Sequence, residues 1–153
     1  MINLNLNMKN NTTDIHRLFV YGSLRSGFRN HAYKYISDFF ELQGDALVHG
    51  KFFDKGPYPV AVPSDEEVFI QGELYTIKDN KDFEWVIAQL DDYEGLNVEP
   101  NETPSYRRDR VEVLLNGDAF TAWIYWYNGS TNGMEEIVTG DILKYLQEKI
   151  KQK

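Results

Sequence analysis

Three carboxylates crowd the short segment Leu90-Asp91-Asp92-Tyr93-Glu94-Gly95, at the end of a predicted helix. The C-terminal end of a helix carries partial negative charge, so acidic side chains there are disfavoured by up to about 1 kcal/mol each. Crowding and the helix end both favour the protonated form, and we expect them to raise a carboxyl pKa toward the range of a general base. The alternative interpretation is that these acids have no function and are solvated surface charges at a helix end, as most acidic clusters are.

A second candidate is the segment Val20-Tyr21-Gly22-Ser23-Leu24-Arg25-Ser26-Gly27, where a predicted strand runs into a sharp turn. Successive backbone N–H groups in such turns make anion-binding nests for a carboxylate or a phosphate. It is not a phosphate loop, because Phe28 and Arg29 follow Gly27 where lysine and Ser/Thr are required. It is not a hydrolase elbow either, because the residues two before and two after Ser23 are not glycine. On spacing alone, a plain strand-to-loop turn remains the commoner interpretation.

The composition excludes several kinds of chemistry. The 153 residues include no cysteine, which removes thiol nucleophiles, disulfides and zinc-thiolate sites. The three histidines, His16, His31 and His49, have no ligand-like spacing, so we expect no metal and no cofactor. The formal net charge of -8 argues against a nucleic-acid partner. No apolar run approaches the ~20 residues of a membrane span, so we expect no membrane association. Because no signal peptide is recognisable, the expected location is the cytoplasm.

The predicted elements alternate irregularly between strands and helices. Phe83, Val86, Ile87 and Leu90 fall on one face of a helix, with Gly95 as its stop, and Asn116-Gly117 predicts a hairpin. The other expected elements are strands at 17–21, 41–53, 58–62 and 68–77, hairpin strands at 106–115 and 119–127, a helix capped by Asn30, a loop at 97–105 and a last helix from about 141.

Because strands dominate and the hairpin is antiparallel, the fold class is α+β, a small curved sheet or barrel with flanking helices. We expect one domain over 16–153. Residues 1–15 are expected to form a disordered or loosely attached tail, with an edge strand as the rival interpretation.

Two further patterns carry weaker signals. Tyr106-Arg107-Arg108 is a small basic patch, typical of a strand end paired with nearby acids. Trp123, Tyr125 and Tyr127 lie on one face of a strand, so this stripe either packs in the core or lines a cleft with hydroxyl groups.

Together these segments resemble the gamma-glutamylcyclotransferase family, in the branch with gamma-glutamylaminecyclotransferase and the avirulence-induced-gene-like proteins. The resemblance runs in order from about residue 17 to the C-terminus. It rests on the segments Leu18-Phe19-Val20-Tyr21-Gly22-Ser23-Leu24-Arg25-x-Gly27-x-x-Asn30, Gly72-Glu73-Leu74-Tyr75, Leu90-Asp91-x-Tyr93-Glu94-Gly95, Tyr106-x-Arg108, Trp123-Ile124-Tyr125 and Gly140-Asp141.

The resemblance implies a small mixed β-barrel with flanking helices and a site for a small gamma-glutamyl substrate. It implies that Glu94 is the catalytic acid/base and that the loop of Tyr21, Gly22, Ser23 and Leu24 holds the glutamyl end. Tyr106 and Tyr125 look like the family's pocket tyrosines, so the resemblance implies that they bind substrate. The implied reaction is cyclisation of a gamma-glutamyl amine or amino acid to 5-oxoproline with release of the free amine, without a metal.

This chemistry also agrees with the residues themselves. The substrate's own α-amine is the nucleophile, so the enzyme needs neither a cysteine nor a triad. The alternatives are a non-catalytic module that binds a small carboxylate, and a scaffold whose acidic surface meets a basic partner. A carboxyl group in an anion-binding pocket favours the enzyme over both. The leaving amine and the oligomeric state are left open by the sequence.

Overall fold

The computed structural model describes residues 15–21, 31–55 and 59–138 of the chain. Its elements, in order, are β1 (Arg17–Val20), α2 (His31–Phe39), β2 (Phe40–Asp54), β3 (Pro59–Pro63), β4 (Phe69–Ile77), the 3-10 turn η2 (Asn80–Asp82), α3 (Phe83–Tyr93), β5 (Tyr106–Leu115), β6 (Asp118–Tyr127) and β7 (Glu135–Ile137). The expected cap at Asn30, the turn after Tyr21, the tail up to residue 14 and the last helix lie outside the described residues.

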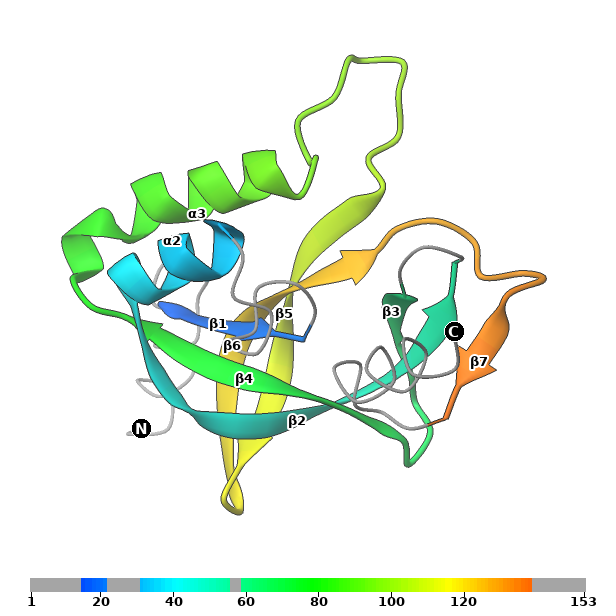
Figure 1. Cartoon of the computed structure of the whole chain (residues 1–153), viewed down its shortest axis with the longest axis horizontal. Helices are drawn as coiled ribbons and strands as arrows, with labels where there is room; N and C mark the ends of the chain where they lie inside the picture. The colour runs from blue at the N-terminus through cyan, green and yellow to red at the C-terminus, as the bar shows by residue number, and fades with distance from the viewer. Residues whose placement is uncertain (1–14, 22–30, 56–58, 139–153) are drawn as a thin grey trace, which may run out of the picture.

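Five strands close into a barrel, as the sequence predicts. The ladder runs β2-β4-β1-β6-β5, and a pairing between β5 and β2 closes it. Most neighbours are antiparallel, but β1 pairs with β6 in parallel. The far half of the long strand β2 leaves the barrel and pairs with β3 and β7. The ribbon in Figure 1 shows this second group of strands beside the barrel, away from the two helices.

Two local features fix the register of the barrel strands, a bulge in β2 and the predicted hairpin turn. The β2–β4 register shifts between Leu42 and Gly44, which marks the bulge. Asn116 and Gly117 both have positive φ, 52° and 87°, as a two-residue hairpin turn between β5 and β6 requires. The bulge and the turn together fix which residues of these strands face the core.

The core has two layers, one on each side of the barrel wall. The interior layer contains Phe19, Phe52, Leu74 and Ile124 among its buried members. The outer layer lies under α2 and α3, which are drawn side by side in Figure 1. Its members include Ile36 from α2, the predicted α3 face of Phe83, Val86, Ile87 and Leu90, and residues of β1, β4 and β6.

Strand β6 is buried on both faces because the helices cover its outer side. Trp123 and Tyr125 belong to the outer layer, whereas Ala122, Ile124 and Trp126 belong to the interior layer. Both stripes of this strand are therefore core. Ile15, which we assigned to the tail, is also buried, and its carbonyl accepts a hydrogen bond from the Trp123 indole at 3.1 Å.

The glycine of the Gly72-Glu73-Leu74-Tyr75 segment lets β4 approach β1 closely. A Cβ at Gly72 would lie 2.3 Å from the Val20 carbonyl oxygen and 2.5 Å from the Phe19 ring. No side chain fits there, since real Cβ atoms do not come within 3.0 Å of other atoms. The close approach positions the end of β1, after which Tyr21 and the predicted turn follow.

Candidate active site

A regular helix end places the three acids of the Asp91–Glu94 segment in different surroundings. Gly95 has φ +78° and donates its N–H to the Asp92 carbonyl at 3.1 Å, and Leu96 donates to the Asp91 carbonyl at 3.0 Å. These two bonds form a Schellman motif, and the side chain of Leu96 packs against the outer core layer. In this motif Glu94 is the C-cap residue of the helix, and Gly95 stops the helix as predicted.

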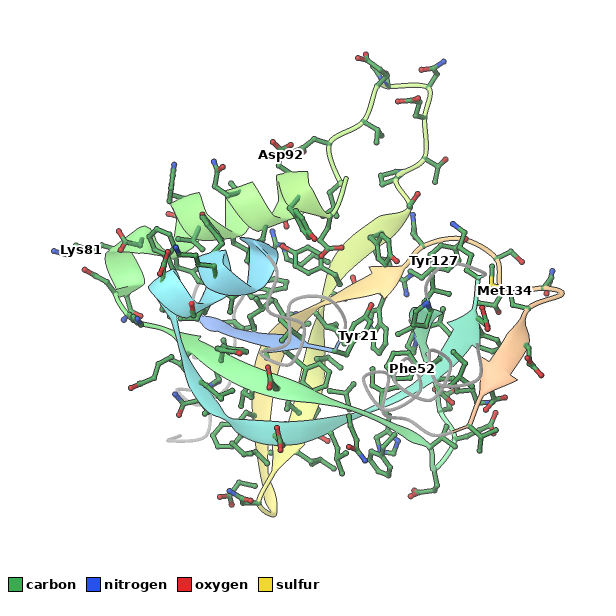
Figure 2. All side chains as sticks on the ribbon, viewed as in Figure 1. Tyr21, Phe52, Lys81, Asp92, Tyr127 and Met134 are labelled. Atoms are coloured by element: carbon green, nitrogen blue, oxygen red, sulfur yellow. The ribbon has the colours of Figure 1, made fainter. Side chains whose placement is uncertain are left out.

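Each acid then meets a different environment. Asp92 is exposed and accepts a hydrogen bond from the Asn97 amide at 3.0 Å, and Figure 2 shows it at the outer end of α3. Asp91 turns toward the sheet and is bound by side chains of β5 and β6. Glu94 is part-buried.

The carboxyl of Glu94 has the electrostatics of a general acid/base. Burial raises its pKa from 4.5 to about 7. The predicted direction is therefore right, but the cause is loss of solvation rather than crowding by Asp91 and Asp92. At neutral pH such a group populates both protonation states, so it can accept a proton and return it.

Two tyrosine hydroxyls lie within electrostatic reach of Glu94. Burial raises the pKa of Tyr21, and the neighbouring Tyr106 and Glu94 raise it further. Burial also raises the pKa of Tyr125, and so do its hydrogen bond to Asp91 and the nearby Glu94. Both hydroxyls therefore stay protonated in the physiological range.

Tyr21 follows β1 directly and turns its ring toward the barrel interior. The ring stacks on Trp126, with 6.4 Å between ring centres, and lies 5.7 Å from Phe52. Its hydroxyl donates a hydrogen bond to the main-chain carbonyl of Tyr125. Figure 2 shows Tyr21 on the inner side of the molecule, near Phe52.

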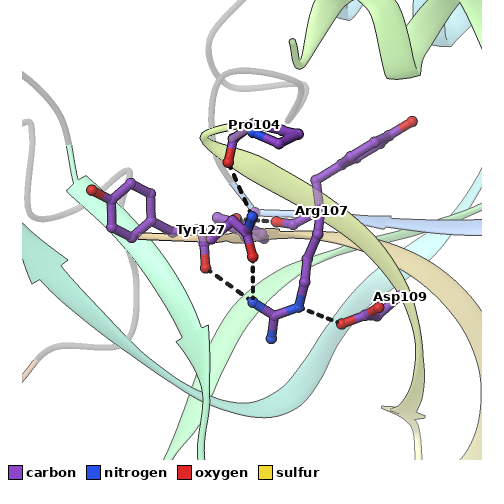
Figure 3. A network of polar contacts seen from close by, with 7 residues as sticks. Pro104, Arg107, Asp109 and Tyr127 are labelled. Atoms are coloured by element: carbon purple, nitrogen blue, oxygen red, sulfur yellow. Dashed lines mark hydrogen bonds and ion pairs between the residues drawn. The ribbon is translucent and has the colours of Figure 1, made fainter. Parts of the chain in front are cut away.

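Tyr106 begins β5 and is held in place by a polar network around Arg107. The Arg107 guanidinium binds Asp109 at 2.8 Å and reaches the Tyr127 carbonyl and the Asn128 side chain at 3.4 Å (Figure 3). The Asn128 amide donates in turn to the Pro104 carbonyl at 3.0 Å, as Figure 3 also shows. This network anchors the chain on both sides of Tyr106, whose ring packs against Tyr127.

Arg108, the other arginine of the basic patch, pairs with Asp91. Its Nε donates to Asp91 Oδ1 at 2.8 Å and its terminal nitrogen donates to Oδ2 at 3.1 Å. The Tyr125 hydroxyl donates to the same Oδ1 at 2.7 Å. Pairing with acids, the commoner expectation for this patch, is what both arginines do.

The structure thus places four of the predicted site residues near one another: Glu94, Tyr21, Tyr106 and Tyr125. Gly22, Ser23 and Leu24 lie outside the described residues. Asp91 and Arg108 are not among the predicted site residues, although both occur in the segments that carry the family resemblance.

The family model described as "Gamma-glutamyl cyclotransferase, AIG2-like" matches residues 18–144. The chain belongs to this family. The chain is also 34% identical over 128 residues to a Vibrio cholerae protein named provisionally as a gamma-glutamylcyclotransferase, covering 82% of this chain and 94% of the relative. It is 33% identical over 114 residues to the gamma-L-glutamyl-butirosin B gamma-glutamyl cyclotransferase of Niallia circulans, covering 72% of this chain and 66% of that enzyme.

The fold agrees with this gamma-glutamyl cyclotransferase assignment. The crystal structure of YkqA from Bacillus subtilis aligns with a TM-score of 0.63 and 28% identity, over 90% of this chain. The chain spans 43% of the YkqA chain, so the likeness covers one part of that protein. Among the described residues, no helix is long and apolar enough to cross a membrane.

Proposed function

We propose that this chain cyclises gamma-glutamyl amines or amino acids to 5-oxoproline and releases the free amine, with Glu94 as general acid/base. The observation that carries the proposal is the part-buried Glu94 carboxyl with a pKa of about 7, beside the end of β1. Membership of the gamma-glutamyl cyclotransferase family supports the same reaction.

The proton balance of the reaction suits a single carboxylate. The substrate's α-ammonium, with an unperturbed pKa of ~8, gives a proton to Glu94. The freed amine attacks the γ-carbonyl carbon and forms the ring C–N bond. Protonated Glu94 then gives the proton to the departing nitrogen as the original amide bond breaks. The regenerated carboxylate takes the second proton of the ring nitrogen, which leaves a neutral lactam, and passes it to the released amine, so Glu94 ends ionised. The pKa values of donor and acceptor are close, which favours transfer in both directions.

We assign Tyr21 and Tyr125 as hydrogen-bond acceptors toward the substrate. A tyrosine hydroxyl has one proton, and here both protons are engaged, on the Tyr125 carbonyl and on Asp91 respectively. Each hydroxyl oxygen can therefore only accept further hydrogen bonds, through its lone pairs. Such an oxygen can bind an ammonium donor but not a carbonyl oxygen. We therefore place the α-amine, rather than the γ-carbonyl, beside these two oxygens and Glu94.

The α-carboxylate is proposed to bind the backbone N–H groups of the turn from Tyr21 to Leu24. This assignment stands on the sequence, where a strand runs into Gly22-Ser23. Because the contact is with main chain, Ser23→Ala should be mild. Gly22→Val should be severe, because a branched side chain blocks the approach and restricts the backbone.

The deciding assay is detection of 5-oxoproline after incubation with a panel of gamma-glutamyl compounds. The panel should include α-amino acids, the lysine ε-amine and larger amines, since the Niallia circulans relative is named for gamma-L-glutamyl-butirosin B. Glu94→Gln should lower turnover by about 10²–10⁴-fold. Glu84→Gln, an exposed acid on the same helix, is the matched control and should keep full activity. Binding without turnover across the panel would favour the carboxylate-binding module instead.

A further inference from the structure

The carboxylate of Asp91 is a junction between one helix and two strands. It accepts both guanidinium bonds of Arg108, at 2.8 and 3.1 Å, and the Tyr125 hydroxyl at 2.7 Å. Arg108 and Tyr125 are direct partners in the β5–β6 register. The Arg108 guanidinium also lies over the Trp123 ring, 4.4 Å from its centre. One side chain at the end of α3 is therefore tied to adjacent strands through three bonds.

The surroundings make these bonds stronger than those of an ordinary surface pair. The side chains of Arg108 and Asp91 are only 22% and 18% exposed, and the contact is bidentate. Partial burial reduces the screening by water, and the paired charges compensate each other. The neighbouring pair Arg107–Asp109 has the same 2.8 Å contact, but its side chains are 40% and 44% exposed and no helix takes part in it.

Asp91 and Glu94 are three residues apart, so they lie on one face of α3. A bond that holds Asp91 against β5 and β6 holds Glu94 against the same part of the sheet. The titratable groups around Glu94 are Tyr21, which follows β1, Tyr106 from β5 and Tyr125 from β6, and the Asp91–Arg108 pair contacts Tyr125. The cause of the raised Glu94 pKa is burial, which depends on how closely the helix end is docked.

We infer that Asp91 is a positioning residue: its bonds to Arg108 and Tyr125 dock the last turn of α3 onto the barrel and so keep the Glu94 carboxyl out of water. Its meaning for catalysis rests on the proposed function, but the docking itself does not. A salt bridge that serves stability alone would leave the solvation of Glu94 unchanged when it is removed.

The test is a carbon-13 NMR titration of the Glu94 carboxyl, with the signal assigned by its loss in Glu94→Gln. Wild type should titrate near 7. Asp91→Ala should lower the midpoint by about one pH unit or more, because the freed helix end lets water reach Glu94. Asp109→Ala, which breaks the equivalent Arg107 pair on the same strand, should leave the midpoint unchanged. An unchanged midpoint in folded Asp91→Ala would overturn the inference.

Loss of the Asp91 charge alone also lowers the Glu94 midpoint, so a second variant separates charge from docking. Asp91→Asn removes the same charge but keeps an oxygen that accepts from Tyr125 and Arg108. The midpoint in Asp91→Asn should lie between those of wild type and Asp91→Ala. Equal midpoints in the two variants would mean that charge explains everything and would refute docking.

Neither measurement needs a substrate, so this inference and the proposed function fail separately. If the enzyme is active, the acid limb of its kcat/KM profile should move in Asp91→Ala by the same amount as the NMR midpoint. If 5-oxoproline is never formed but the midpoints move as expected, the docking role stands and the proposed reaction falls. If Asp91→Ala does not fold, Arg108→Leu takes its place, because it breaks the same pair but removes a positive charge, whose loss alone would raise the Glu94 midpoint. A lowered midpoint in Arg108→Leu would support docking, and an unchanged or raised one would overturn it.

Discussion

Gly72 lies directly against the main chain of Val20, and the space between β4 and β1 is too small for a methyl group. A Cβ added at Gly72 would meet the Val20 carbonyl oxygen at 2.3 Å. Backbone cannot move aside as a flexible side chain can, so one strand must shift. Because Val20 ends β1 immediately before Tyr21, the shift would reach the candidate active site.

We therefore expect Gly72→Ala to lower the free energy of unfolding by about 1–3 kcal/mol, the usual cost of overpacking. Chemical denaturation followed by circular dichroism measures this change. Gly129→Ala is the comparison: its added carbon would also overlap a neighbour, the Tyr127 hydroxyl at 2.5 Å, but the end of a side chain can move aside, so this variant should lose less stability. Equal stabilities of Gly72→Ala and wild type would contradict the close approach of β4 and β1.

Stability should depend on pH through Glu94. Its pKa is about 7 in the folded chain against 4.5 for the free group, so the folded chain binds this proton more tightly. The stabilisation is complete below about pH 4.5 and is lost as the pH rises through 7. The contribution of Glu94 to the free energy of unfolding has an upper limit of about 3 kcal/mol. The actual contribution should be smaller, because Glu94 is only part-buried.

Unfolding free energies of wild type and Glu94→Gln, measured between pH 4.5 and 8, give this contribution as a difference. Other groups titrate in both proteins and cancel. The wild type should lose stability relative to the variant across this range. A constant difference would show that Glu94 titrates near its ordinary value.

The rate of the proposed cyclisation should rise with pH through 7, as Glu94 becomes able to take the proton of the substrate ammonium. Above the substrate amine pKa of ~8, kcat/KM should fall again, giving a bell. The profile is measured by 5-oxoproline formation at limiting substrate. An acid limb near pH 4.5 would place the active carboxyl elsewhere or in a more hydrated state.

We expect activity to survive exhaustive chelation. The substrate supplies its own nucleophile and Glu94 moves the proton, so the proposed chemistry has no step that a Lewis acid must perform. The assay compares turnover before and after dialysis against a chelator. A loss of turnover restored by one added divalent ion would contradict the expectation.

The local parts of this fold were predictable from the sequence. The apolar spacing from Phe83 to Leu90 predicted α3, and Asn116-Gly117 predicted the hairpin, because each signal lies within a few residues. Strand β7 was not predicted. Its three residues carry no alternating pattern, and it exists because β2 offers an edge far away in the sequence.

The site shows the same division. The sequence indicates the acidic cluster as a candidate site. Residue types alone cannot say whether Asp91 or Glu94 is the important acid, because both side chains are carboxylic acids. What separates them is the β5–β6 register, which places Arg108 opposite Tyr125 and so supplies the two partners of Asp91. The burial of Tyr125 likewise depends on the helices packed over β6.

The connection between α3 and β5 begins after Glu94 and ends before Tyr106, and it is fastened at both ends. The Schellman motif holds its start, and the bond from the Asn128 N–H to the Ser105 carbonyl, at 2.7 Å, holds its finish. Figure 1 shows its middle rising away from the barrel, and residues 97–103 are all exposed. Such a segment can be lengthened, shortened or replaced by another loop while Glu94 and Tyr106 keep their places.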